Sequence, residues 1–277
     1  MNSKIMQYFI LYPIITFFLG SCITYTDHEA ARLELPMIQP GEKVLDYKGY
    51  TDIVYGQSLE MVPDMETIAY SVSYDEWHKI PKWVAYSLSR EELGSFARRK
   101  GKQFHQDPGA PFQQAERLDY RGSGWTNGHL APAADFSWSD KAMDDTFYYT
   151  NICPQDETLN GGSWHRLENR IRDWAQKFGE IYIVSGPIVG KAENGTIGTN
   201  NVTVPDAFFK AVLARDGDSY QTVAFIMENS AATQPYPQCC LTVNDLESII
   251  GIDLFCAIDD AIEESVEGKV NIRFWGM

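Results

Sequence analysis

Three polar side chains near the middle of the 277-residue chain have the types and spacing that hydrolytic chemistry requires. His129 follows Gly128 in a glycine- and proline-punctuated segment, Asn160 precedes a helical pattern, and Glu168 falls one turn into it. A neutral histidine can take a proton from water because its ordinary pKa lies near neutral pH. An amide oxygen beside a carboxylate suits Mg²⁺, a hard cation that prefers oxygen ligands and retains water. Each residue alone is also explained by a structural histidine, a helix cap or a surface ion pair.

The element that must position Glu168 is an amphipathic helix over residues 163–178. Its apolar residues recur at offsets of 3, 4, 3 and 4, which is the spacing of one helix face: Trp164, Leu167, Ile171, Trp174 and Phe178. Gly161-Gly162 precedes the pattern and Gly179 ends it. Arg172 follows Glu168 by four residues and can therefore orient or neutralise its carboxylate.

Short β-rich runs lie on both sides of this helix in the chain, and a second helix is expected near Val243 to Ile250. The runs cover residues 68–72, 83–88, 181–184 and 222–226. Strands grouped around a central helix predict one α+β domain. We expect three parts: a signal peptide over residues 1–21, a tether over residues 22–65, and the folded domain over residues 66–277.

The N-terminus has the pattern of an export signal. Residues 5–19 are almost wholly apolar after Lys4, and this run is shorter than the roughly 20 residues that span a bilayer. The following Leu19-Gly20-Ser21-Cys22 resembles the lipobox of bacterial lipoproteins. That resemblance implies lipidation of Cys22 and anchoring in the bacterial cell envelope, on a face the sequence does not specify. An ordinary signal peptide cleaved near Gly20-Ser21 is the alternative, and both place the domain outside the cytoplasm.

Charge is unevenly distributed along the chain. The 23 basic and 38 acidic residues give a net charge of −15, which opposes long-range attraction of polyanions. Residues 98–129 nevertheless hold six cations against three acids, whereas residues 243–268 hold eight acids and no Lys or Arg. The middle of the chain is thus locally basic, either as a solvated face or as a nucleic-acid contact.

The cysteines that follow the signal are Cys153, Cys239, Cys240 and Cys256. An oxidising compartment permits disulfides, and we expect one bridge from Cys239 or Cys240 to Cys256. No C-x-x-C pattern occurs, so a thiolate zinc site has no support.

Four sequence blocks occur in an order and spacing that resemble the DNA/RNA non-specific endonuclease family, the ββα-metal nucleases. They are Gly128-His129-Leu130-Ala131-Pro132-Ala133-Ala134-Asp135, Asn151-Ile152-Cys153-Pro154-Gln155, Leu159-Asn160-Gly161-Gly162-Ser163-Trp164 and Leu167-Glu168. The resemblance covers residues 67–256. It implies the ββα-metal nuclease fold, with mixed sheet and a central metal-site helix, and DNA and RNA as substrates cut to 5′-phosphate ends.

The resemblance also implies roles for individual residues. His129 would be a solvent-facing general base, Asn160 the direct ligand of Mg²⁺ (or Mn²⁺), and Glu168 would hold the water shell of the metal. Asn151 and Arg172 match polar positions that support this cluster.

The sequence departs from the family where a motif arginine is replaced by Asn127. Loss of one transition-state cation can lower the rate by roughly 10²–10³-fold. Lys102, where the family often carries a phosphate-contacting arginine, and Arg121 are the expected substrate-binding cations, and Asn127 is the third expected substrate contact. The alternatives are a catalytically silent, nuclease-like binding or scaffold domain and a phosphodiesterase that acts on small nucleotides.

Overall fold

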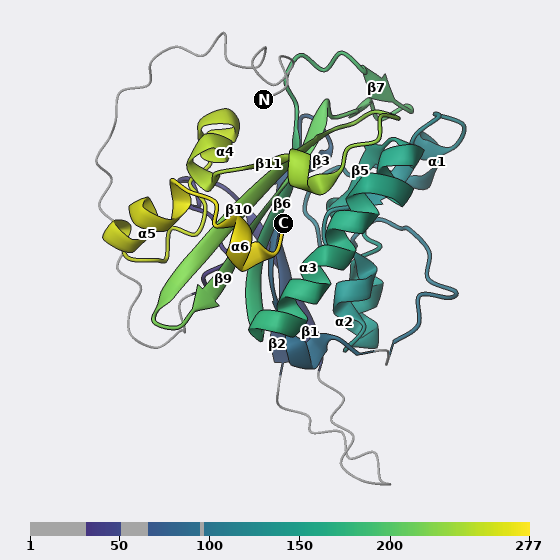
Figure 1. Ribbon diagram of the computed structural model, residues 1–277. Helices are drawn as coiled ribbons and strands as arrows, with labels where there is room; N and C mark the ends of the chain where they lie inside the picture. The colour runs from purple at the N-terminus through teal and green to yellow at the C-terminus, as the bar shows by residue number, and fades with distance from the viewer. Residues whose placement is uncertain (1–31, 51–65, 95–96) are drawn as a thin grey trace, which may run out of the picture.

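The computed structural model describes residues 32–50, 66–94 and 97–277, and its centre is a seven-stranded sheet (Figure 1). Neighbouring strands of this sheet pair antiparallel. In spatial order the strands are β1 (Val44–Tyr50), β2 (Glu66–Asp75), β3 (Ile80–Ser89), β6 (Glu180–Ile188), β9 (Ala207–Asp216), β10 (Ser219–Glu228) and β11 (Cys240–Leu241). Two small hairpins pair β4 (Thr126–His129) with β5 (Ile152–Gln155), and β7 (Thr196–Ile197) with β8 (Val202–Thr203).

Helices cover both faces of the sheet (Figure 1). The α-helices are α1 (Arg117–Tyr120), α2 (Asp140–Asp145), α3 (His165–Phe178), α4 (Val243–Ile250), α5 (Asp260–Glu267) and α6 (Ile272–Trp275). Short turns of 3₁₀-helix are η2 (Arg90–Glu92), η3 (Ala133–Phe136), η4 (Tyr149–Asn151) and η6 (Tyr236–Gln238), and η5 (Leu159–Trp164) is a π-helical turn.

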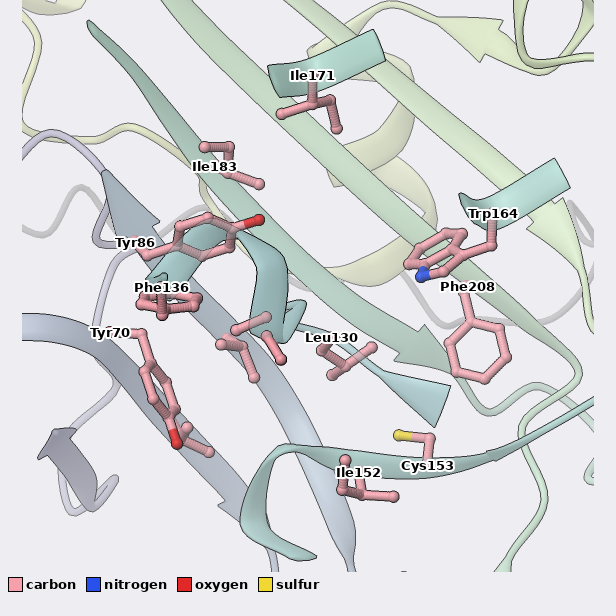
Figure 2. Close-up of a cluster of buried hydrophobic side chains, with 14 of the residues drawn as sticks. Tyr70, Tyr86, Leu130, Phe136, Ile152, Cys153, Trp164, Ile171, Ile183 and Phe208 are labelled. Carbon is pink, nitrogen blue, oxygen red and sulfur yellow. The ribbon is translucent and has the colours of Figure 1, made fainter. Parts of the chain in front are cut away.

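The larger core lies between the sheet and α3. The apolar stripe predicted for this helix is buried in it, and Leu130 lies between Phe136 on one side and Trp164 on the other (Figure 2). A second core, which includes Val243 and Leu246 of α4, packs on the opposite face of the sheet. The α+β class is therefore confirmed, and so are the predicted strands and both predicted helices.

The prediction of a tether over residues 22–65 is wrong for part of its length. Val44–Tyr50 forms β1 and pairs with β2, and Leu33 packs in the second core. The Tyr47 hydroxyl donates to Asp107 Oδ2 at 2.6 Å and lies 2.7 Å from Thr150 Oγ1. A short edge strand gains its stability from its neighbour rather than from its own composition. The predicted signal peptide, Cys22 and residues 51–65 lie outside the described residues.

The predicted disulfide to Cys256 is also wrong, because Cys239 and Cys240 are both free thiols. The reason is their placement in the fold. Cys239 and Cys240 pack against the larger core, whereas the Cys256 thiol contacts the Leu35 carbonyl, and Leu35 belongs to the second core.

No helix in the described part of the chain is long and apolar enough to cross a bilayer.

Candidate active site

A two-stranded hairpin carries the predicted base. His129 ends β4 opposite Ile152 of β5, and the chain then leads through η5 into α3. Gly128 is required here because a Cβ atom at this position would overlap the Gln155 side chain. Hairpin and helix together give the ββα arrangement that the sequence blocks implied.

His129 is an enclosed residue, so the expectation of a solvent-facing base is wrong. Only 8% of it is exposed, and its ring lies 5.2 Å from Phe104 and 5.1 Å from Phe147, centroid to centroid. Its Nε2 atom is buried without a hydrogen-bond partner. Burial, with a smaller contribution from Arg99, lowers the pKa of His129 to about 3. The imidazole is therefore neutral, as a base must be.

Asn160 lies in the π-helical turn η5 and its amide is fixed in orientation. Its Nδ2 donates to Thr126 Oγ1 at 2.9 Å, and the Thr126 hydroxyl donates to the Gln155 carbonyl at 2.8 Å. Because the nitrogen is occupied, Oδ1 is the amide atom that remains for a cation. π-Helical turns occur frequently at functional sites.

Glu168 lies one turn into α3 and is 9% exposed. Burial raises the pKa of its carboxyl, and the charge of Lys210 is the largest influence in the opposite direction. Arg172 contributes less to Glu168 than expected because its Nη1 donates to Asp135 Oδ1 at 2.6 Å. Arg172 therefore positions the loop after His129 by tying it to α3.

Asn151 is fully buried and locks the same loop. Its Oδ1 accepts from the Ala131 amide, and its Nδ2 donates to the carbonyls of Ala131 and Thr146, each at 2.9 Å. All of these partners are backbone atoms. Asn151 is thus a positioning residue and not a group that touches substrate.

One of the three predicted substrate contacts is corrected by the structure. Lys102 Nζ lies 3.1 Å from Asp140 and 3.3 Å from Asp144, and its side chain is 10% exposed, so its charge is neutralised by α2. Asn127 is half-buried, with its Oδ1 buried without a partner, and its contact with substrate stays a prediction. Arg121 is exposed after α1, and it stays a prediction.

Arg99 is a cation beside the site that the sequence analysis did not select. Its guanidinium carbon lies 5.8 Å from the Phe147 ring, which in turn packs edge-on against His129. It is exposed, and its charge lowers the pKa of both His129 and Glu168. The sequence signal was the basic cluster over residues 98–102. A cluster of this kind does not show which of its cations lies beside the site.

The oxygen donors fit a hard divalent cation. Asn160 Oδ1, in η5, and the Glu168 carboxylate, in the first turn of α3, are oxygen donors of the kind that such a cation takes. Among residues 32–50, 66–94 and 97–277, no three His, Cys, Asp or Glu side chains form a metal cage. A site with few protein ligands is typical of Mg²⁺, which retains several waters.

A hairpin that holds a neutral histidine, followed by a helical segment with an amide oxygen and a buried carboxylate, defines the ββα-metal nuclease fold. The chain belongs to the DNA/RNA non-specific endonuclease family, whose profile matches residues 59–261. The family predicted from the four sequence blocks is thereby confirmed.

Curated relatives of this chain include proteins from animals and fungi. The chain is 36% identical over 220 residues to the mitochondrial nuclease EXOG of Xenopus laevis, which covers 74% of this chain and 62% of the relative. It is 33% identical over 210 residues to nuclease C1 of Cunninghamella echinulata var. echinulata, covering 70% of this chain and 83% of the relative. The chain thus spans about three fifths of the length of the EXOG proteins it matches.

A solved structure has the same fold. Endonuclease G, in the crystal structure of its complex with EndoGI, superimposes with a TM-score of 0.65 at 27% sequence identity. The alignment covers 70% of this chain and 86% of that chain.

Proposed function

We propose that this protein is an exported, metal-dependent endonuclease that hydrolyses DNA and RNA without strong sequence preference. The observation that carries the proposal is the hydrogen bond from Asn160 to Thr126. It joins the predicted metal ligand to the strand that ends, three residues later, in the neutral His129.

In the proposed reaction His129 accepts the proton of a water that attacks phosphorus. Because Nε2 is enclosed, we assign this transfer to Nδ1. The bond from phosphorus to the 3′-oxygen breaks, and this oxygen leaves with the bonding electron pair and takes a proton from solvent water, which gives 5′-phosphate and 3′-hydroxyl ends. A phosphate anion beside the imidazole raises the pKa of His129 and so strengthens it as a base.

Asn160 and Glu168 would hold Mg²⁺ or Mn²⁺, which would supply positive charge at the phosphate. Arg99, exposed beside His129, would bind the non-bridging phosphate oxygens in place of the motif arginine that Asn127 replaces. Contacts of this kind bind the phosphate backbone of the nucleic acid and carry no information on base sequence. This supports weak sequence preference.

A plasmid-nicking assay tests the activity. Wild-type protein should nick supercoiled DNA with Mg²⁺ or Mn²⁺ and lose this activity in EDTA. His129→Gln should be inactive at an unchanged melting temperature, because glutamine retains a polar group of similar size between Phe104 and Phe147. Absence of cleavage by the wild-type protein with either metal would favour the silent binding domain, for which the replacement at Asn127 argues.

We also propose that the protein is anchored in a bacterial envelope through lipid on Cys22. The support is the sequence of residues 1–22 alone, and several relatives are instead named as mitochondrial. Cys22→Ala should release the protein from the membrane fraction and abolish palmitate labelling without changing nuclease activity. A Cys22→Ala variant that still fractionates with membranes would refute the anchor.

A further inference from the structure

Lys210 is a buried charge next to the site, hydrogen-bonded to the residue that follows His129. It lies on β9, an interior strand of the sheet, is 0% exposed, and has mainly apolar neighbours along its strand. An ammonium group in such a place is costly unless it is hydrogen-bonded and paired. Its partners therefore indicate what the charge does.

The ammonium group binds the backbone that carries the base. Lys210 Nζ donates to the Leu130 carbonyl at 2.7 Å and to Ser185 Oγ at 3.2 Å, and lies 4.7 Å from the Trp164 ring. Trp164 Nε1 itself donates to the His129 carbonyl at 3.4 Å. Lys210 and the Trp164 indole that it contacts thus hydrogen-bond to two successive carbonyls, those of Leu130 and His129.

The same charge acts on the carboxylate of the site. Lys210 is the strongest favourable charge on Glu168, and Asp135 and Arg172 complete a group of two acids and two bases.

We propose that Lys210 is the positioning residue that aligns the backbone after His129 with η5, the turn that contains both Trp164 and Asn160. This deepens the proposed function on which it rests. Lys210 is fully buried, so it acts through the Leu130 carbonyl and the Trp164 ring. Such supporting partners typically change activity or metal affinity by about 10- to 100-fold.

The test is Lys210→Met, which retains the length of the side chain without the charge. The variant should lower kcat by about 10- to 100-fold with KM for duplex DNA within about twofold. Its dissociation constant for Mn²⁺, measured by calorimetry without DNA, should rise about tenfold. Ser185→Ala is the matched control: it removes the 3.2 Å bond but leaves the charge and the Leu130 contact, and should retain wild-type kcat and Mn²⁺ affinity.

A second comparison separates loss of positioning from loss of stability. It compares the double variant Asp135→Asn, Lys210→Met with Asp135→Asn alone. The double variant removes one acid and one base, so the buried group stays neutral overall. Lys210→Met on the Asp135→Asn background should again lower kcat and Mn²⁺ affinity.

A folded Lys210→Met protein with wild-type kcat and Mn²⁺ affinity would overturn the proposal. So would a double variant as active as Asp135→Asn alone, because Lys210 would then be purely structural. If the wild-type protein cleaves no DNA, the proposed function fails, while the Mn²⁺ affinities of wild type and variants still decide the role of Lys210.

Discussion

The amide nitrogen of Asn160 donates to the hydroxyl oxygen of Thr126 at 2.9 Å, across 34 residues of sequence. Thr126 in turn donates its only hydroxyl proton to the Gln155 carbonyl, so its oxygen can only accept from Asn160. The direction of the bond therefore fixes which end of the amide is left for a cation.

We expect Thr126→Val to weaken metal binding, because valine keeps the shape of threonine and removes the acceptor. The concentration of Mg²⁺ for half-maximal cleavage should rise about tenfold, with kcat at saturating metal much less affected. Thr126→Ser retains the hydroxyl and should behave like the wild type. Equal metal requirements for the valine and serine variants would show that Thr126 does not orient Asn160.

Arg99 should prove to be the cation that compensates for Asn127. Arg99→Ala removes a charge that acts on both His129 and Glu168 and should lower kcat by about 100-fold. Arg98→Ala removes an exposed neighbouring charge and should change kcat by less than about threefold, since a solvated charge away from the site is screened.

The variant Asn127→Arg provides an independent check. It should gain little in the wild type, where Arg99 already supplies positive charge, and should raise kcat on the Arg99→Ala background. If Arg121→Ala, and not Arg99→Ala, proves the damaging substitution, the assignment of Arg99 is wrong.

Much of the fold could be predicted from local pattern. The stripe from Trp164 to Phe178 and the strand over residues 181–184 each follow one periodicity, and both recur in the structure. β1 and β9 escaped prediction for opposite reasons. Val44–Tyr50 is stabilised by pairing with β2, and Ala207–Asp216 is buried on both faces and shows no alternation.

The site was predictable in its residue types and less so in its contacts. His129, Asn160 and Glu168 were selected by motif, but a motif does not show that the imidazole is enclosed by Phe104 and Phe147. Lys102 was assigned to substrate because its pairing with Asp140 and Asp144 depends on where α2 packs. Such long-range partners follow from tertiary packing and not from spacing.

The acid side of the pH–rate profile should be set by Glu168 and should depend on metal. Burial raises the pKa of Glu168 above its ordinary value and lowers that of His129 to about 3. As pH falls, Glu168 is therefore protonated while His129 is still neutral. A bound cation favours the carboxylate, so the acid limb of kcat/KM should move to lower pH as Mg²⁺ is raised. A limb that is independent of Mg²⁺ would contradict this assignment.

A last prediction concerns stability at the acidic C-terminal end. Glu267 is 2% exposed, its Oε1 has no hydrogen-bond partner, and burial together with the charges of Glu247, Glu263 and Asp253 raises its pKa to about 9. A carboxyl whose pKa is raised by folding binds its proton more tightly in the folded state. The folded state is therefore favoured while Glu267 is protonated, and this advantage is lost as pH rises from about 4.5, the ordinary pKa, through about 9.

Glu267→Gln should raise the melting temperature by several degrees at pH 8 and change it little at pH 5, with ~1 kcal/mol corresponding to roughly 2–4 °C in a chain of this size. Glu264→Gln, an exposed position on the same helix, makes the same change in net charge and should have little effect at either pH. Equal stabilisation by both substitutions would mean that overall charge, and not the buried carboxyl, controls stability at this end of the molecule.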